Sequence, residues 1–237
     1  MSIYIMGGAE RQKKPQLTNE SFARGEYLSA SRKLPNAKLS DYDDFDKSKK
    51  KFVKLSFENM NEYAEIMAKE ISEKYGIPDE IIYIERGGMV IARLLSDKLG
   101  VKRMQGVNAS YYSDIEKPSR SVSIGAVPKV RNASTVLLVD DITDSGKTLS
   151  KVYDALRKST DAKIVTCTIV SKPQSIIKPD VYAVEVPNST WVVFEYEERE
   201  SLDSFTKSGN KEGLAFMKEN FRGKRQVGNA NGKSQAP

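Results

Sequence analysis

The sequence predicts an α/β fold with a mostly parallel central sheet of about five strands flanked by helices. Two observations lead to this class. Short apolar runs alternate with stretches in which apolar residues recur at helical spacing, and Gly or Pro residues separate them. Strands that alternate with helices are joined by right-handed crossovers, so they form a parallel sheet with helices on its faces.

The first part of the regular pattern contains two helices with a strand between them. Apolar side chains in residues 60–71 fall on one helical face, and Gly76 and Pro78 end this helix. Residues 81–84 follow as a short buried strand. The next helix has its own apolar face and ends at Gly100.

The second part contains the remaining strands and one more helix. A strand near residues 101–107 precedes the long, polar, turn-rich stretch 113–129. The apolar run 135–139 predicts a strand that leads into a helix through Leu156. The last strands are expected at residues 163–170, 181–186 and 191–194.

The pattern divides the chain into a domain with two appendages. Residues 1–50 show no sustained periodicity and are rich in Lys, Asp, Ser and Asn, so we expect a partly disordered N-terminal extension. Residues 51–200 form the expected domain. The Gly, Asn, Lys, Ser and Gln residues near the end predict a partly disordered C-terminal tail over residues 201–237.

The composition excludes several kinds of chemistry. The chain has no histidine, which excludes His-based triads and most zinc sites and leaves carboxylates, Lys, Arg and Tyr for catalysis. The single cysteine, Cys167, cannot form an intramolecular disulfide, and its apolar neighbours indicate a buried hydrophobic side chain. No apolar run approaches a membrane span and the start lacks a secretory signal, so we expect a cytoplasmic protein without membrane contact.

The net charge of +6 is concentrated at the two ends. Residues 1–54 carry 12 basic and 7 acidic side chains, residues 201–237 carry 7 and 3, and the stretch between them carries 19 and 22. A basic protein often binds nucleic acid. This distribution is more typical of solvated polar tails, so we expect no nucleic acid partner.

Residues 136–149 place acids beside a phosphate-sized loop. Four apolar residues lead into Asp140 and Asp141, and a turn with Asp144 opens into a helix rich in Ser, Gly and Thr. Open α/β sheets bind ligands at the carboxyl ends of their strands, and a helix N-terminus attracts phosphate. The adjacent acids repel each other unless a cation or hydroxyl donors compensate, as a magnesium-bound sugar diphosphate would. Lys147 is not a P-loop lysine, because the Gly-x-x-x-x-Gly-Lys-Ser/Thr spacing is absent.

A second anion site is predicted between strand 81–84 and the helix that follows it. Arg86 supplies charge there, and Gly87 and Gly88 let backbone amides converge. Taken alone, the same residues also fit a structural strand–helix turn.

The segment 136–149 resembles the phosphoribosyl-diphosphate signature of type I phosphoribosyltransferases, and the resemblance covers about residues 52–198. It implies their fold, with a small hood built from later strands. It also implies that Asp140 and Asp141 contact the ribose hydroxyls and Mg²⁺, the expected cofactor, and that Asp144 lies near N7 of a purine as the general acid or base. The donor phosphates are then expected at Thr143, Ser145, Gly146, Lys147 and Thr148 and at Arg86, Gly87 and Gly88.

Ser110 and Tyr111, followed by the polar stretch 113–129, are similar to the mobile hood loop of the 6-oxopurine members. Such a loop excludes water, which competes with the base in glycosyl transfer. Without the resemblance, the stretch is a surface loop and the tyrosines are packing residues.

Lys172-Pro173 and Trp191-Val192 resemble the base-binding residues of bacterial xanthine–guanine phosphoribosyltransferases. The resemblance implies that Lys172 selects an exocyclic oxygen, that Trp191 stacks on the purine and that the Val192 backbone reads the 2-position. An ammonium favours an oxygen over an amine, and an indole offers a stacking face. Taken alone, Trp191 also fits a core aromatic residue and Lys172 a surface lysine. Further candidates for a magnesium contact are Glu195, Glu197 and Glu198.

The resemblance implies transfer of a phosphoribosyl group from phosphoribosyl diphosphate to hypoxanthine, guanine or xanthine in purine salvage. The products are pyrophosphate and a nucleotide of the IMP, GMP or XMP type. Because the family commonly forms dimers or tetramers, we expect a homo-oligomer. Two alternatives stay open. One is the same fold acting on adenine or a pyrimidine, which Lys172 and Trp191 disfavour. The other is a regulatory protein that senses the donor and binds nucleic acid through its basic ends.

Overall fold

The computed structural model describes residues 51–112 and 121–221, which belong to one compact unit. Residues 1–50, 113–120 and 222–237 lie outside the described residues. The N-terminal extension, part of the hood loop and the end of the C-terminal tail therefore stay predictions.

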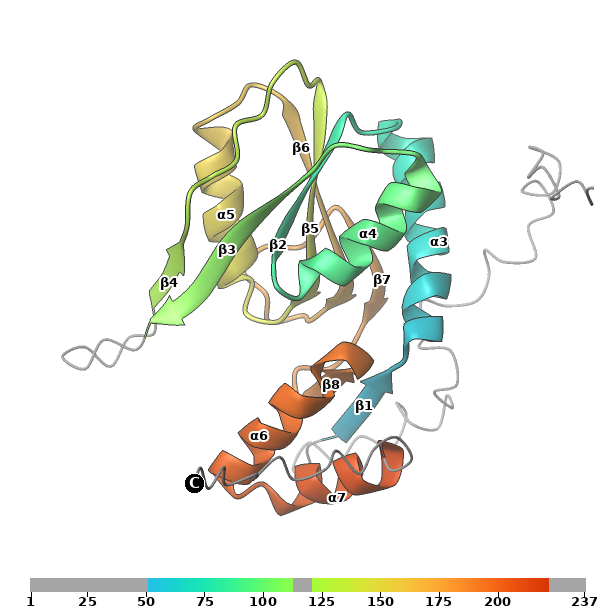
Figure 1. The fold of residues 1–237 in the computed structure, drawn as a ribbon, viewed down its shortest axis with the longest axis vertical. Coiled ribbons are helices and arrows are strands. Elements are labelled where there is room, and N and C mark those ends of the chain that lie inside the picture. The colour runs from blue at the N-terminus through green and yellow to red at the C-terminus, as the bar shows by residue number, and fades with distance from the viewer. Residues whose placement is uncertain (1–50, 113–120, 222–237) are drawn as a thin grey trace, which may run out of the picture. The chain divides into compact units, whose positions relative to one another are not determined.

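A six-stranded sheet with the strand order β4-β3-β2-β5-β6-β7 forms the centre of this unit (Figure 1). Five strands run parallel, and β4 pairs antiparallel with β3 at one edge. The strands are β2 (Glu80–Glu85), β3 (Met104–Tyr112), β4 (Ser121–Ile124), β5 (Thr135–Thr143), β6 (Lys163–Ser171) and β7 (Val181–Glu185). The prediction of a mostly parallel sheet is confirmed, and β4 lies in the stretch expected as a loop.

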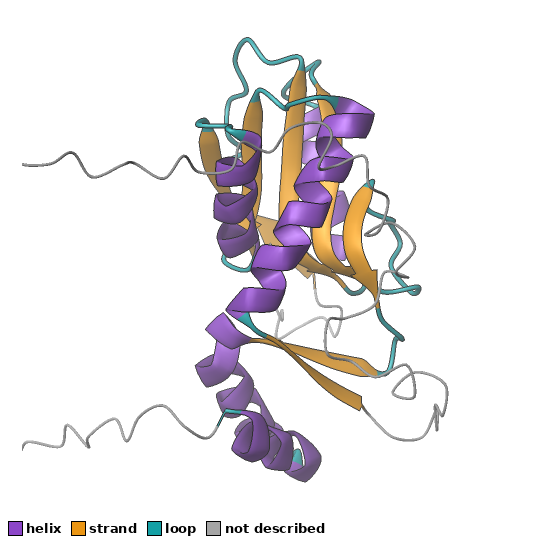
Figure 2. Ribbon diagram, turned by 90° about the vertical axis from the view of Figure 1, so that its right-hand side faces the viewer, coloured by secondary structure: helices purple, strands orange, loops and turns teal. Residues whose placement is uncertain are grey.

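Helices cover both faces of this sheet (Figure 2). They are α3 (Phe57–Tyr75), α4 (Gly88–Leu99) and α5 (Lys147–Arg157). On one face, Leu137 of β5 joins side chains of α3 and α4 in the larger core cluster. On the other face, Leu138 joins side chains of α5. Among the described residues, no helix has the length and apolar character of a membrane-spanning segment.

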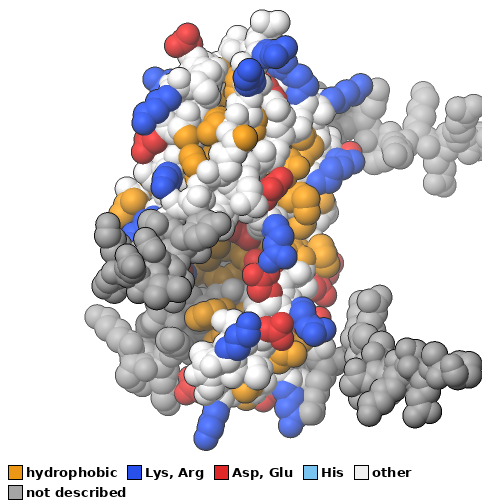
Figure 3. Space-filling model, turned by 60° about the vertical axis from the view of Figure 1, so that its left-hand side comes forward, with side chains coloured by type: hydrophobic (Ala, Val, Ile, Leu, Met, Phe, Trp, Pro, Cys, Tyr) orange, Lys and Arg blue, Asp and Glu red, His pale blue; other side chains and the backbone are white. Residues whose placement is uncertain are grey.

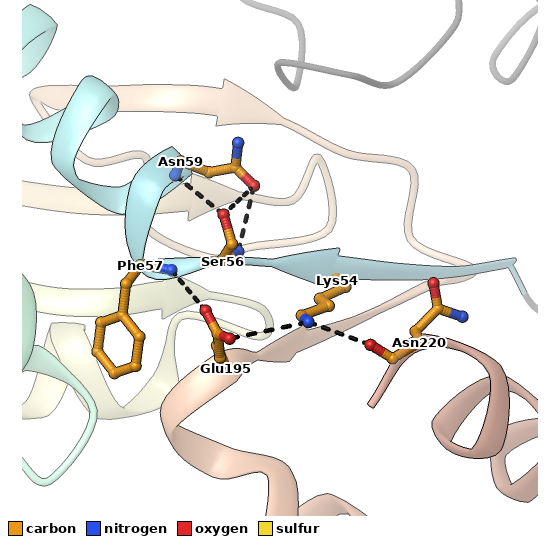
Figure 4. Close-up of polar contacts among 6 residues, drawn as sticks. All are labelled: Lys54, Ser56, Phe57, Asn59, Glu195 and Asn220. Carbon is orange, nitrogen blue, oxygen red and sulfur yellow. Dashed lines mark hydrogen bonds and ion pairs between the residues drawn. The ribbon is translucent and has the colours of Figure 1, made fainter. Parts of the chain in front are cut away.

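The helix ends agree with their sequence signals. α3 begins with a capping box, in which the Ser56 hydroxyl accepts from the Asn59 N–H and the Asn59 side chain accepts from the Ser56 N–H, both at 3.1 Å (Figure 4). α4 ends at Gly100, which has a left-handed φ of 71° and returns its N–H to the last turn. These caps determine where α3 begins and where α4 ends.

Cys167 lies in β6 and is completely buried, with its Sγ 3.8 Å from the Met67 Sδ. Burial raises the pKa of its thiol far above the ordinary value. The prediction of a buried hydrophobic side chain is therefore confirmed.

A second, two-stranded parallel sheet pairs the start of the described chain with a late strand. β1 (Lys51–Leu55) lies beside β8 (Thr190–Phe194). The 3-10 helix η1 (Glu195–Glu197), α6 (Glu198–Ser208) and α7 (Lys211–Asn220) follow β8. We call this sheet with η1, α6 and α7 the hood. One of its two strands, β1, comes from the beginning of the domain, whereas the sequence predicted a hood built from later strands.

The hood has its own small core between the β1–β8 sheet and the two helices that follow it (Figure 1). α6 buries only Ser201 and Phe205. So sparse an apolar pattern explains why the helical signal is weak after Glu200. Glu195 ties the hood to α3, because its carboxylate accepts from the Phe57 N–H at 2.9 Å; within the hood, the same carboxylate lies 3.8 Å from the Lys54 ammonium (Figure 4).

Candidate active site

The acidic pair Asp140 and Asp141 lies within β5, which was expected to end at residue 139 and instead continues to Thr143. β5 continues because it pairs with β6 as far as Thr143 opposite Ser171. Both acids are buried, with 8% and 7% of their surfaces exposed. Asp140 Oδ1 accepts from the Asp141 N–H at 3.0 Å, and Asp141 Oδ1 accepts from the Ile142 N–H at 2.7 Å.

The two carboxylates place uncompensated charge inside the protein. Burial raises the pKa of Asp140 well above its ordinary value, and the Asp141 charge raises it further. Burial also raises the pKa of Asp141, although a hydrogen bond from the Tyr196 hydroxyl at 2.8 Å opposes this shift. Among the described residues, neither acid forms an ion pair with Lys or Arg. Such a pair favours a divalent cation or hydroxyl donors as its partner.

The acidic pair fits a magnesium ion that protein and substrate hold together. In the described part of the chain, no group of three or more His, Cys, Asp or Glu side chains is placed to enclose a metal. Mg²⁺ is usually bound by one or two carboxylates together with substrate phosphates. Two buried carboxylates without a cationic partner match that requirement.

The turn between β2 and α4 lies directly against the acidic pair. This turn begins with a cis peptide bond between Glu85 and Arg86. A Cβ atom at Gly87 would be 2.0 Å from Asp141 Oδ2, and one at Gly88 would be 2.5 Å from the carbonyl oxygen of the last β5 residue before the acids. Only glycine lets the turn approach β5 so closely. The predicted pyrophosphate loop therefore adjoins the predicted ribose-binding acids.

Arg86 is exposed and contacts the hood. Its guanidinium forms an ion pair with the Glu200 carboxylate of α6, and 77% and 64% of the two side chains are exposed. The preceding Glu85 lays its carboxylate over Gly106 of β3, where a Cβ atom would be 2.3 Å from Glu85 Oε1. The cation expected to meet the diphosphate is therefore paired with a carboxylate of the hood.

The turn into α5 forms the predicted phosphate loop. Gly146 has a left-handed φ of 74°, and a Cβ atom there would be 2.2 Å from the Ser175 Oγ. A cavity of about 430 Å³ lies over this turn, lined by residues 140–146 with Thr148 and Leu149. The N-terminus of α5 and the acidic pair therefore border one cavity, as an anion-binding helix N-terminus beside a cation site requires.

Two of the predicted phosphate-binding residues have other environments. Thr143 borders the cavity, but its hydroxyl lies inside the sheet, 3.1 Å from the Thr168 hydroxyl. Its carbonyl accepts from the Lys172 N–H at 3.0 Å. Lys147 is exposed and is not among the residues that line the cavity. Of the predicted phosphate-binding residues in this turn, Ser145, Gly146 and Thr148 line the cavity.

Asp144 and Lys172 form an ion pair beside this cavity. The Lys172 Nζ lies 2.9 Å from Asp144 Oδ2, and 7% of the Lys172 side chain and 51% of the Asp144 side chain are exposed. The side-chain amide of Gln174 donates to the other oxygen, Asp144 Oδ1. Two predicted base-contacting groups are therefore neighbours. Gln174 was not predicted, because a single glutamine in a loop carries no distinguishing sequence signal.

The hood adds Tyr196, which sequence reasoning missed, and Glu197. The Tyr196 hydroxyl donates to Asp141 Oδ2 at 2.8 Å and lies 3.4 Å from the Gly87 carbonyl oxygen. Burial and the nearby carboxylates raise the pKa of Tyr196 far above its ordinary value, so its hydroxyl keeps its proton. Burial, followed by the Asp141 charge, raises the pKa of Glu197 to about 7. The hood therefore contacts both the acidic pair and the pyrophosphate loop.

β8 presents Trp191 and Val192 on opposite faces. The Trp191 side chain is 36% exposed and packs on the Phe205 ring of α6, with the ring centroids 5.1 Å apart. Val192 packs on the other side against the larger core cluster. The predicted base-contacting residues thus come from two sheets, since Lys172 follows β6 of the main sheet.

Ser110 and Tyr111 lie in a strand pair rather than in a loop. They pair with Ser123 and Val122 of β4 in an antiparallel ladder. The Lys151 ammonium of α5 donates to the Val122 carbonyl. The predicted hood loop therefore begins as an extension of the main sheet, and its residues 113–120 lie outside the described residues.

A second cavity, of about 820 Å³, lies along α6 beside Arg86. Its lining consists of Arg86, Tyr196, Arg199, Glu200, Asp203, Ser204, Lys207 and Ser208. Basic and acidic side chains also stand close together beside the hollow visible in Figure 3. Tyr196 borders this cavity and donates to Asp141, which lines the first cavity, so this hydrogen bond links the walls of the two cavities.

Comparisons with known proteins agree with this geometry. The family model for the phosphoribosyl transferase domain matches residues 57–200. A xanthine-guanine phosphoribosyltransferase of Gluconobacter oxydans is 26% identical over 147 residues, which cover 62% of this chain and 84% of that protein. The match to the Helicobacter pylori xanthine-guanine-hypoxanthine phosphoribosyltransferase has a TM-score of 0.58 at 25% identity and covers 65% and 99% of the two chains. The match to a purine phosphoribosyltransferase from Pyrococcus horikoshii has a TM-score of 0.54 at 27% identity and covers 61% of this chain and 93% of that chain.

The family match includes every part of the site that lies on the main sheet. The acidic pair, the phosphate loop and the pyrophosphate loop all fall within residues 57–200. The mostly parallel sheet with helices on both faces is also the architecture of the solved relatives. The chain therefore belongs to the phosphoribosyltransferase family, of type I, and is a glycosyltransferase of the pentosyltransferase class.

Proposed function

We propose that the protein transfers a 5-phosphoribosyl group from phosphoribosyl diphosphate to a 6-oxopurine, namely hypoxanthine, guanine or xanthine. The observation that carries this proposal is the ion pair between Asp144 and Lys172, at 2.9 Å. A 6-oxopurine has N7 and O6 side by side. When N7 bears a proton, this edge offers a donor next to an acceptor, which complements a carboxylate next to an ammonium.

The same pair argues against adenine as the acceptor. An ammonium has three donors and no acceptor, so Lys172 suits the oxygen at C6 of an oxopurine and not the amine of adenine. Lys172 is only 7% exposed, and an unsatisfied buried donor costs about 1–3 kcal/mol. The relatives from Gluconobacter oxydans and Helicobacter pylori are named for xanthine and guanine, which supports the same class of acceptor.

We place the donor along β5 and the turns on either side of it. Its 5′-phosphate binds the loop of residues 145–148 at the N-terminus of α5, and its ribose hydroxyls bind Asp140 and Asp141. The cavity of about 430 Å³ over these residues supports this placement. The diphosphate lies at residues 86–88. When bound by the acidic pair and the diphosphate, Mg²⁺ supplies neutralisation of the charge on the leaving group.

The reaction is a displacement at C1′ of the ribose. N9 of the base forms a bond to C1′ while the bond from C1′ to the diphosphate oxygen breaks, so pyrophosphate leaves with the bonding electrons and C1′ is inverted. A base bound with its proton on N7 gives that proton to Asp144, which acts as the general base. Arg86 stabilises the charge on the departing pyrophosphate once it is released from Glu200.

A panel of acceptor bases tests the proposal. The purified full-length protein is incubated with Mg²⁺ and phosphoribosyl diphosphate and with hypoxanthine, guanine, xanthine, adenine or uracil in turn, and the nucleotide formed is measured by chromatography. We expect product from at least one 6-oxopurine and far less from adenine and uracil. Product from adenine or uracil alone, or from no base, would refute the proposal.

Lys172→Gln tests the residue that carries base selection. Removal of the ammonium should lower kcat/KM for the preferred 6-oxopurine by about tenfold, the effect of one lost buried hydrogen bond to a charged group. The ratio of kcat/KM for this base to kcat/KM for adenine should also fall. Lys178→Gln is the matched control, because this lysine also follows β6 but forms an exposed ion pair with Glu185 at 3.6 Å. Equal effects of both variants would contradict the assigned role.

A further inference from the structure

The proposed stacking residue Trp191 rests on an aromatic side chain from outside the shared family domain. The rings of Trp191 and Phe205 have centroids 5.1 Å apart and are tilted by 58°. Phe205 is completely buried, whereas 36% of Trp191 is exposed. Phe52, which lies opposite Trp191 in the β1–β8 register, meets the Phe205 ring edge-on at 5.5 Å. A change in the position of Phe205 must therefore change the support of the indole.

Phe205 is itself held by the helix that follows it. α6 and α7 form a helical pair, which we call the C-terminal hairpin (Glu198–Asn220). Gly213 of α7 lies against the Phe205 ring, and a Cβ atom there would be 2.7 Å from two of its carbons. Val193 and Met217 complete the buried cluster around the ring. The backbone of α7 thus contacts the Phe205 ring, which in turn contacts the indole.

The strand that carries the indole spans the two halves of the proposed site. Just before β8, the Asn188 side chain accepts from the Gln174 N–H at 3.1 Å, in the loop that begins with Lys172. Just after β8, the Tyr196 hydroxyl reaches Asp141 Oδ2 at 2.8 Å. The indole therefore lies on the segment that joins the base-selecting lysine to the donor-binding acids.

We infer that the C-terminal hairpin is a working part of the base site, in which Phe205 is a positioning residue that fixes the stacking orientation of Trp191. The inference rests on the proposed function and on the stacking role that the family resemblance implies for Trp191. The family match ends at residue 200, so almost the whole hairpin is an addition to the matched domain. Through Phe205 the hairpin sets the affinity for the purine, whereas its contact with the donor side is the separate ion pair of Glu200 with Arg86.

Phe205→Leu tests the inference in the full-length protein, and Phe216→Leu is the matched control. Phe216 belongs to the same cluster and stacks on Phe52 at 5.4 Å, but its ring contacts are with Phe52 and Phe221. Trp191 is the only tryptophan of the chain, so intrinsic fluorescence reports on its surroundings alone. The measurements are the emission spectrum, its quenching by GMP, and the KM values for guanine and for phosphoribosyl diphosphate.

We expect Phe205→Leu to shift the emission to the red and to raise the KM for the base about three- to tenfold, the range of one aromatic contact. The KM for the donor should change less than about twofold, because the donor contacts lie on the main sheet. The control should resemble the parent in both properties. An unchanged emission or base KM in Phe205→Leu, equal rises in both KM values, or equal effects in the control would overturn the inference.

Two further measurements separate possible failures. If Phe205→Leu does not fold, Gly213→Ala replaces it, because the added methyl group displaces the ring without removing it; this variant should change the emission and the base KM, and no change in either overturns the inference. Nucleotide formation by the parent protein tests the proposed function alone. An active parent with a red-shifted variant but an unchanged base KM would refute the role of the hairpin and leave phosphoribosyl transfer standing.

Discussion

Replacement of Glu197 by Gln should stabilise the folded protein at alkaline pH and have little effect in mild acid. Glu197 lies partly buried beside Asp141, and these surroundings raise its pKa from 4.5 to about 7. Between these two values the folded protein holds a proton that the unfolded chain has released. The free energy of unfolding therefore falls as the pH rises through this window, and the full penalty is present above about 7.

The size of this penalty follows from the pKa change. A rise from 4.5 to about 7, at about 1.36 kcal/mol per unit, corresponds to about 3 kcal/mol. Solvent screens a carboxylate that keeps part of its surface exposed, so we expect about 1–2 kcal/mol. Gln has nearly the same shape without the charge. The free energy of unfolding of Glu197→Gln should exceed that of the parent by this amount above a pH of about 7 and by almost nothing near pH 4.5.

Urea unfolding at about pH 5 and about pH 8, with a chelator present to remove divalent cations, measures both values. Glu198→Gln is the control, because Glu198 is the next residue and is exposed. The gain should appear for Glu197→Gln at the higher pH only. A gain of equal size at both pH values, or a loss at the higher pH, would show that the Glu197 charge does not oppose folding.

Three further substitutions address the donor and the chemistry. Gly87→Ala places a methyl group 2.0 Å from Asp141 Oδ2, so donor binding measured by calorimetry should be lost and urea unfolding should show a destabilisation of about 1–3 kcal/mol; normal donor affinity would mean that the turn is not part of the site. Glu200→Gln removes the ion-pair partner of Arg86, so the KM for phosphoribosyl diphosphate should fall about two- to fivefold, as expected for release from an exposed ion pair. An increase in this KM would show instead that the ion pair holds Arg86 in position for the donor. Asp144→Asn should lower kcat by about a hundredfold or more while donor affinity stays near the parent value, and parallel losses in both would argue against its role as general base.

The acidic pair and the turn into α5 could be predicted from sequence because they are contiguous. A buried strand, the acids Asp140 and Asp141 and a glycine-containing helix start follow one another directly, so local pattern and topology place them together. The predicted end of β5 was wrong. Acidic residues are rare in strands, so the strand was expected to stop before Asp140. Pairing with β6 keeps the backbone extended as far as Thr143.

The hood could be predicted only in outline because its contacts are between residues far apart in the chain. Tyr196 and Glu200 meet Asp141 and Arg86, which lie more than 50 residues earlier, and no local pattern encodes such contacts. β1 is a five-residue strand whose two lysines, Lys51 and Lys54, are three residues apart and so break the alternation of a strand; it is recognised only by its pairing with β8.

In the proposed base site, the pairing of β5 with β6 determines where Asp144 and Lys172 lie. Thr143 lies opposite Ser171, and Asp144 and Lys172 are the residues that come next in each strand direction. Neighbouring strands are about 4.8 Å apart, so the spacing between the carboxylate and the ammonium is inherited from the sheet and not from a flexible loop. The main sheet thus sets the distance between the two groups proposed to bind adjacent atoms of the purine. A different heterocycle can then be accepted through new side chains at these two positions, with the backbone of the enzyme unchanged.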